Sequence, residues 1–292
     1  MLPTLGSKEP IYHLAQALIG AGSPRDLVAV TTPGYPVPAR GAAFAGAQTL
    51  AMALDPASGW LPAYDALDAA TWRRLALVWL TTPNNPTGAV APLAYLEDLA
   101  ERCRRHGVVL ACDEAYGALY LGDQRPASVL ELSDPTHVLA LHSLSKRSSV
   151  PGYRSGFVAG DPLLIAALKQ LRPSLGVTPQ RFVQRASIAA WEDEEHVDAA
   201  RERYRAKDVA LRPGLDAAGL QVEGGDGGIF RWCRVPGGGD GEAFAERLLG
   251  HGVVVTPGAF LGDGGAQHVR IALVPSLADC EAAVARFAAA AQ

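Results

Sequence analysis

One short segment of the sequence combines an amine, two hydroxyls and a guanidinium. Lys146 follows Ser143 and Ser145, and Arg154 comes eight residues after the lysine. A lysine amine can form a Schiff base with an aldehyde, and hydroxyls and a guanidinium can hold a phosphate. Pyridoxal phosphate carries both groups, so the segment is a candidate site for that cofactor. Taken alone, the same residues could form a polar surface loop.

Two further polar motifs each follow an apolar run that predicts a buried strand. Asn85 lies in the turn after residues 75–80, and Asp113 follows residues 108–112, with Tyr116 three positions later. Because ligands bind beyond the carboxyl ends of parallel strands, these side chains can share one site. An unpaired buried carboxylate is costly. Asp113 could therefore pair with a protonated ring nitrogen, or it could cap the segment that follows.

The first residues predict a helix whose N-terminus could bind a phosphate. Apolar residues recur at helical spacing between Ile11 and Ile19. Gly6, Ser7 and Lys8 precede this segment, and Ser7 is of a type that caps helices. Free backbone N–H groups at a helix start favour an anion, although an ordinary capped helix has the same pattern.

Two more side chains have both a functional and an ordinary structural interpretation. Tyr35 lies in a turn-rich loop after the predicted strand 27–30, where its ring could stack on a flat cofactor or pack within the loop. Arg270 lies in an alternating strand, where it could bind a carboxylate or face solvent. Neither residue predicts a site by itself.

The composition narrows the class of function. A chain of 292 residues can bury a large core in one or two domains. The net charge is −4 and there is no basic stripe, so we expect no nucleic-acid partner. No apolar run is long enough to span a bilayer, so we expect no membrane contact. The seven histidines lack metal-ligand spacing, which predicts that there is no metal site.

Cysteine usage and the first residues predict the compartment. The four cysteines are far apart in the sequence, and Cys112 lies in an apolar run. This pattern favours buried thiols in a reducing compartment over disulfides. The first four residues lack the basic and apolar regions of a signal peptide. We therefore expect a cytoplasmic protein.

The alternation of apolar strands with helical patterns predicts an α/β fold. Its core is expected to be a three-layer, mostly parallel sheet with helices on both faces. A composition shift near residue 219 predicts a small C-terminal α+β domain. The expected division is residues 1–190, a connecting helix over 191–218, and residues 219–292. The expected strands of the small domain are 220–223, 228–233, 253–255 and 268–273.

The order of these motifs resembles the class I and II aminotransferases, which are fold-type I pyridoxal-phosphate enzymes. Each motif is modest, but six of them in this order cover nearly the whole chain. The matching motifs are Gly6-Ser7-Lys8, Pro33-Gly34-Tyr35-Pro36, Asn85-Pro86-Thr87-Gly88, Asp113-x-x-Tyr116, Ser143-x-Ser145-Lys146 with Arg154, and Arg270. Residues 143–161 and 184–197 look most similar to succinyldiaminopimelate aminotransferases of lysine biosynthesis.

The resemblance implies catalytic roles for three residues. Lys146 would bind the cofactor aldehyde and then shuttle a proton on the substrate. Asp113 would pair with the ring N–H and keep the ring electron-withdrawing. Tyr116 and Asn85 would hydrogen-bond the phenolic oxygen, and Asn85 would also contact substrate.

The resemblance also implies how the rest of the cofactor and the substrate are held. Tyr35 would stack on the ring. Arg270 would clamp the substrate α-carboxylate with two hydrogen bonds, which selects the bond that breaks. The phosphate would bind the motif that begins at Gly6 and the hydroxyl and cationic groups of Ser7, Lys8, Ser143, Ser145 and Arg154.

The resemblance implies an activity and leaves alternatives open. The expected reaction moves an amino group between N-succinyl-LL-2,6-diaminopimelate and 2-oxoglutarate, in a homodimer. Transamination of alanine or aspartate, or a β-eliminating C–S lyase, would use the same scaffold. A ligand sensor and an inactive truncated paralogue are the non-catalytic alternatives. The family's N-terminal region, which precedes the Gly-Ser-Lys motif, is expected to be missing from this sequence.

Overall fold

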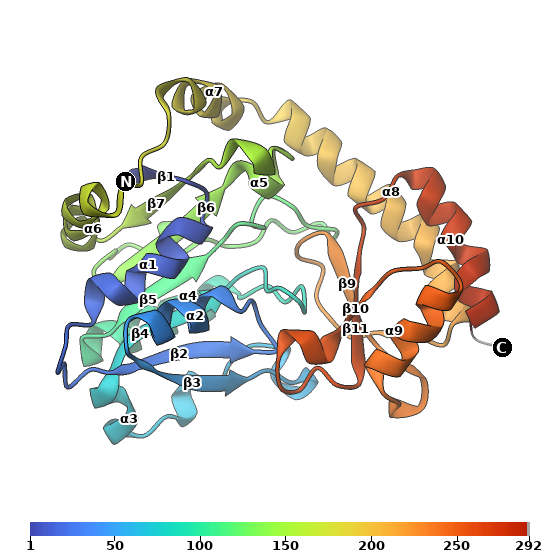
Figure 1. Ribbon diagram of the computed structural model, residues 1–292, viewed down its shortest axis with the longest axis horizontal. Coiled ribbons are helices and arrows are strands. Elements are labelled where there is room, and N and C mark those ends of the chain that lie inside the picture. Colours follow the sequence, from blue (N-terminus) through green and yellow to red (C-terminus); the bar gives the residue numbers. More distant parts are fainter. Residues whose placement is uncertain (291–292) are drawn as a thin grey trace.

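A seven-stranded sheet forms the centre of the larger part of the protein (Figure 1). The structure is a computed structural model, and it describes residues 1–290. Five neighbouring strands are parallel, and β7 and then β1 continue one edge. β7 is antiparallel to both β6 and β1, so it alone runs against the other strands. In spatial order the strands are β1 (Leu2–Thr4), β7 (Gly156–Gly160), β6 (Val138–Ser143), β5 (Val109–Asp113), β4 (Leu75–Thr81), β2 (Leu27–Thr32) and β3 (Gln48–Ala53).

Helices cover both faces of this sheet, because its central strands are apolar on both sides. Leu110 and Cys112 pack in one core layer with α4, while Val109 and Ala111 pack in the other layer with α1 and α2. This arrangement confirms the predicted three-layer fold. The helices of this part are α1 (Lys8–Leu18), α2 (Val37–Phe44), α3 (Ala69–Arg74), α4 (Leu93–His106), α5 (Leu144–Arg147), α6 (Pro162–Leu175) and α7 (Arg181–Glu192).

Two helix boundaries show how local residues define these elements. α4 ends at Gly107, which adopts the left-handed conformation (φ 64°) that glycine reaches without strain. α6 begins after Asp161, whose side chain accepts the backbone N–H of Leu163 at 2.7 Å.

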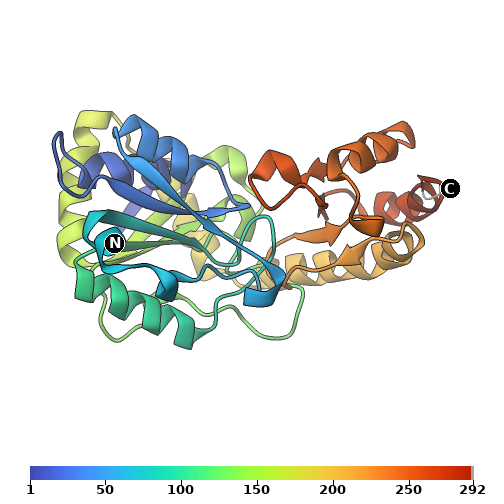
Figure 2. The same ribbon diagram turned by 90° about the horizontal axis from the view of Figure 1, so that it is seen from below.

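A second, antiparallel sheet lies beside the first and has its own apolar core (Figure 2). The long helix α8 (Glu195–Ala217) leads to this sheet from α7 and packs along α10. Gly214 permits their close approach, since a Cβ there would lie 2.9 Å from Val284 Cα. The other elements are β8 (Gln221–Val222), β9 (Phe230–Arg234), α9 (Gly241–Gly250), β10 (Thr256–Pro257), β11 (His268–Ala272) and α10 (Leu277–Ala290).

Two local predictions were wrong. Residues 253–255 do not form a strand: the Val253 N–H bonds to Leu248 O at the end of α9, and Val254 is 83% exposed. The three valines resemble a strand in sequence, but the chain there is still completing a helix end. Conversely, β1 was not predicted, because three residues are too few to have a periodic pattern. It pairs with β7.

Among residues 1–290, no helix has the length and apolarity that crossing a membrane requires. Within the same range, no group of three or more His, Cys, Asp or Glu side chains could hold a metal ion. All four cysteines are buried and unpaired. Residues 291 and 292, which end the predicted C-terminal domain, lie outside the described range.

Candidate active site

A cavity of about 440 Å³ lies between the carboxyl ends of the central strands and the small sheet. β4, β5 and β6 contribute their last residues, and β9 and β11 form the opposite wall. All but one of the site residues predicted from the sequence line this cavity. They are Ser7, Lys8, Tyr35, Asn85, Asp113, Tyr116, Ser143, Ser145, Lys146, Arg154 and Arg270.

Asp113 ends β5 inside the cavity and is buried. Burial raises the pKa of its carboxyl to about 6, although the Ala115 N–H, which donates to Oδ1 at 3.2 Å, opposes this shift. Burial also raises the pKa of Tyr116, and the negative charge of Asp113 adds to this effect. A cationic partner would therefore strongly favour the ionised form of Asp113.

Arg270 connects the small sheet to the loop that follows β4. Its Nη1 donates to Asn85 Oδ1 at 2.7 Å, and its Nη2 donates to Thr256 Oγ1 at 3.2 Å. Nε is buried and has no hydrogen-bond partner among the described residues. Burial lowers the pKa of this guanidinium. The side chain thus faces the cavity, not solvent, and retains an unused donor.

The loop of residues 224–228 is rich in glycine and precedes β9. It holds the loop that carries Asn85 against the small sheet. Gly225 N donates to Thr87 O, and Gly227 N donates to Gly88 O, both at 2.9 Å. A Cβ on Gly225 would lie 2.4 Å from Gly88 O, so only glycine permits this backbone contact. The position of Asn85 therefore depends on contacts with a segment far away in the sequence.

Lys146 extends from α5, the single helical turn that follows β6. Ser143 caps this turn, with its Oγ accepting the Ser145 N–H at 3.1 Å. The Lys146 amine is half-buried and lies 5.8 Å from the centre of the Tyr116 ring. Burial lowers its pKa, and the charges of Arg270 and Lys8 add to this effect. A lysine in this environment loses its proton more readily and is a better nucleophile.

Arg154 reaches the cavity from a left-handed backbone conformation (φ 51°). Its Nη1 lies 3.4 Å from Ser145 Oγ, and its Nη2 donates to Leu5 O at 2.9 Å. Gly6 is the one predicted residue outside the cavity lining. It lies behind the guanidinium, where a Cβ would be 2.7 Å from Nη2.

One detail at the start of α1 differs from the prediction. Ser7 precedes the helix, but its own backbone is helical (φ −64°, ψ −27°) and its side chain makes no capping hydrogen bond. A capping side chain needs an extended backbone to fold back onto the helix N–H groups. The hydroxyl instead lines the cavity.

The charges in the cavity favour an anionic ligand. The lining contains four cationic side chains and one carboxylate, that of Asp113. The cations are Lys8, Lys146, Arg154 and Arg270. Together with the serine hydroxyls and the unused donor of Arg270, they provide the groups that a phosphate and a carboxylate bind.

Several lining residues were not predicted. The Phe230 ring lies 5.2 Å from the Tyr116 ring in an edge-to-face arrangement and 5.7 Å from Arg270 Cζ. These apolar side chains lack a chemical signature, and only the packing of the two sheets brings them to the cavity. The other lining residues that were not predicted are the polar Thr81 and the apolar Ala115, Pro151, Ile229, Ala272 and Val274.

The family model for aminotransferase class I and II matches residues 4–287. The chain belongs to this family. Class I and II aminotransferases are pyridoxal-phosphate enzymes, in agreement with the predicted cofactor and with the charges of the cavity. The match extends over both sheets, and so the family assignment applies to the whole of the described fold.

Individual relatives agree with the family model. An LL-diaminopimelate aminotransferase of Nitratidesulfovibrio vulgaris is 38% identical over 288 residues, which are 97% of this chain and 74% of the relative. An aminotransferase structure from Neisseria meningitidis has a TM-score of 0.92 at 32% identity, covering 99% of this chain and 76% of that one. A probable N-succinyldiaminopimelate aminotransferase from Thermus thermophilus has a TM-score of 0.89 at 30% identity, with coverages of 99% and 77%. The chain thus spans about three quarters of the length of these relatives.

Proposed function

We propose that this aminotransferase transfers an amino group between N-succinyl-LL-2,6-diaminopimelate and 2-oxoglutarate. The observation that carries the proposal is the meeting of Lys146, Asp113 and Arg270 in one cavity. These groups suit an aldehyde, a ring nitrogen and a carboxylate. The substrate choice is supported by the diaminopimelate in the names of two of the relatives, one of which is named as a probable aminotransferase of the N-succinyl form.

The residues fit pyridoxal phosphate, which supplies an aldehyde and an electron-withdrawing ring. Lys146 would hold the aldehyde carbon and then move the proton at the substrate Cα. Asp113 would accept the ring N–H, which offsets the cost of burying its charge. Because Asn85 Oδ1 accepts from Arg270, the NH₂ group of Asn85 is left to donate. It would hydrogen-bond the phenolic oxygen of the cofactor, together with the Tyr116 hydroxyl.

The phosphate and the ring face would be held by the remaining residues. Ser145 and Arg154 are already in contact, and a phosphate oxygen would accept from both of them. Gly6 leaves the space that the guanidinium occupies. Ser7, Lys8 and Ser143 complete the phosphate site, and Tyr35 would stack on the ring.

Arg270 would bind the substrate α-carboxylate. Its unused Nε and a terminal nitrogen can form two parallel hydrogen bonds with one carboxylate. This contact orients the substrate, and the orientation determines which Cα bond is cleaved. In this proposal Asn85 fixes the direction of Arg270 as well as contacting the cofactor.

LL-diaminopimelate without the succinyl group is the second candidate donor, because the Nitratidesulfovibrio vulgaris relative is named for it. The two donors differ at the distal amine, which the succinyl group replaces with an amide and a carboxylate. Each donor is assayed with 2-oxoglutarate, and glutamate formation is measured. Turnover of the succinylated donor at a kcat/KM above that of the free one supports the proposal, and the reverse supports the second candidate.

Three control substrates test the remaining reactions. Alanine and aspartate as donors test for a broader transaminase. Pyruvate and ammonia formed from cystathionine without a keto-acid acceptor would indicate a C–S lyase. If no donor changes the cofactor absorbance, the chain is inactive as an aminotransferase.

We also propose that the protein is a homodimer and that it is cytoplasmic. We further propose that the chain divides into a large domain of residues 1–190, a connecting helix over 191–218 and a small domain of residues 219–292. The buried, unpaired cysteines support a reducing compartment. The apolar core of the small sheet, to which Leu211 and Leu215 of α8 also contribute, supports a division from the larger sheet. Light scattering of the purified protein measures the oligomeric state, and limited proteolysis measures the boundaries.

A further inference from the structure

The helical turn that carries Lys146 cannot hold its position alone. α5 has four residues, and a helix this short has little stability of its own. The two residues that follow the lysine are Arg147 and Ser148, and neither lines the catalytic cavity. Their contacts therefore determine how the turn is anchored.

Arg147 is buried and binds the end of α7. Its side chain is 5% exposed, and its Nη1 donates to Ala190 O at 2.5 Å. Its Nη2 donates to Asp193 O at 3.3 Å and to Glu194 Oε1 at 2.5 Å. The guanidinium carbon lies 4.8 Å from the centre of the Trp191 ring. Arg147 thus satisfies carbonyls that have no partner within the helix.

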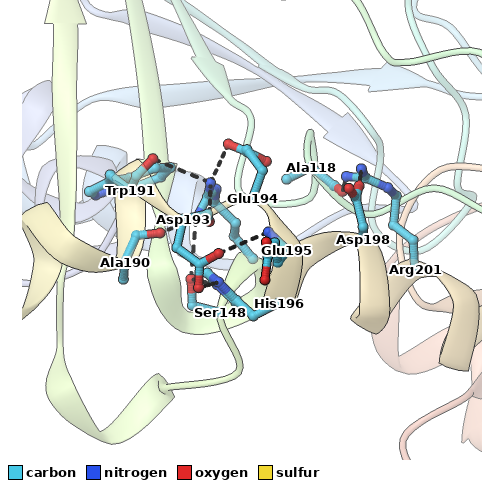
Figure 3. Close-up of polar contacts among 11 residues, drawn as sticks. Ala118, Ser148, Ala190, Trp191, Asp193, Glu194, Glu195, His196, Asp198 and Arg201 are labelled. Atoms are coloured by element: carbon cyan, nitrogen blue, oxygen red, sulfur yellow. Dashed lines mark hydrogen bonds and ion pairs between the residues drawn. The ribbon is translucent and has the colours of Figure 1, made fainter.

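A second bridge joins the same elements. His196 is in the first turn of α8, and its Nε2 lies 2.8 Å from Ser148 Oγ. Its Nδ1 lies 2.8 Å from Asp193 Oδ2, so the imidazole connects α5 with both sides of the junction between α7 and α8 (Figure 3). The contacts of Arg147 and Ser148 therefore meet at residues 190–196.

The serine, histidine and carboxylate have the connectivity of a hydrolytic triad, but their surroundings do not suit hydrolysis. The Asp193 side chain is 50% exposed, where it has little influence on the imidazole. The backbone N–H groups of residues 148–150 already donate to Leu144 O and Lys146 O, so they cannot stabilise an oxyanion. The arrangement is instead suited to fastening one element to another.

The junction leads directly to the small sheet through α8. Asp208 on α8 accepts two hydrogen bonds from Arg231 on β9, at 2.5 and 2.6 Å, and both residues are buried. β9 in turn pairs with β11, where Trp232 lies opposite Arg270. A continuous series of contacts therefore joins the lysine turn to the strand that carries Arg270.

We propose that Arg147 is a positioning residue that orients Lys146 relative to Arg270 by fastening α5 to the start of α8. The hydrogen bond between Ser148 and His196 is a second, weaker contact between the same elements. The inference rests on the proposed function only in taking Lys146 as the cofactor lysine. Loosening the fastening should change the reactivity of Lys146 although none of its residues touches the cavity.

The experiment compares Arg147→Met with a matched control, Arg25→Met. Arg25 also donates to two backbone carbonyls, Leu75 O at 2.6 Å and His106 O at 2.7 Å, at the start of β4 and the end of α4. Both substitutions should lower the melting temperature. Only Arg147→Met should change the reactivity of the Lys146 amine.

The first measurement needs no cofactor and no turnover. The cofactor-free protein is labelled with acetic anhydride at a series of pH values, and the modification of Lys146 is measured by mass spectrometry. We expect Arg147→Met to move the labelling midpoint away from that of the wild type, and Arg25→Met to leave it unchanged. If the wild type transaminates none of the tested donors, the proposed function fails while this comparison still tests the positioning role.

The second measurement separates positioning from binding. A misplaced catalytic group costs about 10- to 100-fold in rate, so kcat of Arg147→Met should fall by this factor. KM of the amino donor should change by less than about twofold, because Arg270 and Asn85 are untouched. Arg147→Lys keeps the charge but not the planar fork, and it should give intermediate values.

If Arg147→Met does not fold, Ser148→Ala replaces it in both measurements. This variant removes one hydroxyl contact, and kcat should fall by about two- to fivefold, as expected for a single hydrogen bond. The proposal is overturned if the folded variants keep the wild-type labelling midpoint of Lys146 and the wild-type kcat. It is also overturned if Arg25→Met changes these two quantities as much as Arg147→Met does.

Discussion

Arg270 Nη1 donates to Asn85 Oδ1 at 2.7 Å, although the two residues are 185 positions apart in the chain. This hydrogen bond joins the small sheet to the loop after β4, across the cavity that both residues line. It orients both side chains at once, since the amide acceptor fixes the guanidinium and the guanidinium fixes the amide.

Asn85→Ala should impair both the binding of the donor and the chemical step. The substitution leaves one nitrogen of a buried guanidinium without its acceptor, which costs about 1–3 kcal/mol. We expect kcat/KM for the amino donor to fall by about 10- to 100-fold. Thr256→Val, which removes only the 3.2 Å contact of Nη2, should have a smaller effect. Equal effects in the two variants would contradict this assignment.

Lys146→Ala should abolish the absorbance of the lysine-bound cofactor and lower kcat by at least about 100-fold, because the proton-transfer group is lost. Absorbance spectra with added pyridoxal phosphate and a glutamate assay provide the measurements. Lys169→Ala, at an exposed position of α6, is the matched control and should retain both properties. If turnover persists in Lys146→Ala, another residue must be the proton-transfer group.

The cofactor-free protein should lose stability relative to Asp113→Asn as the pH rises from about 4 to about 6. Burial raises the pKa of the Asp113 carboxyl to about 6. The folded state therefore holds this proton more tightly than the unfolded state, and the stability from the protonated form is lost on ionisation. The difference in the free energy of unfolding should reach about 3 kcal/mol, measured by urea denaturation.

Pyridoxal phosphate should reduce this pH dependence, because a ring N–H favours the ionised carboxylate. The same denaturation series with saturating cofactor is the control. A wild-type protein and an Asp113→Asn variant with parallel pH profiles in the absence of cofactor would contradict the raised pKa.

Gly225→Ala should destabilise the contact between the glycine-rich loop and the Asn85 loop. A Cβ there would lie 2.4 Å from Gly88 O and 2.9 Å from Ala89 Cα, so the backbone must move. We expect a loss of about 1–3 kcal/mol in the free energy of unfolding, together with a higher KM for the donor. At Gly20 a Cβ meets no atom within 4 Å, so Gly20→Ala should have little effect. If Gly225→Ala keeps the wild-type KM for the donor, the glycine-rich loop does not contribute to substrate binding.

The residues that gather in the cavity could be named in advance because they lie in local sequence patterns. The motif of Lys146 with its two serines can be recognised within a few residues of sequence. The same is true of Asp113 at the end of an apolar run. Alternating apolar runs and helical periodicity predicted the layers in the same way. Short or atypical segments were predicted less well: β1 has three residues, and Val253 belongs to a helix end despite its β-branched neighbours.

By itself, the sequence determined which groups could bind a cofactor and that the main sheet would be mostly parallel, since these properties depend on residue type and spacing. Tertiary structure alone decided that Arg270 faces Asn85, that Phe230 lines the cavity, and that Arg147 fastens the lysine turn to α8. Each of these contacts joins segments far apart in the chain. Their geometry depends on how whole elements pack against one another, and no local pattern contains that information.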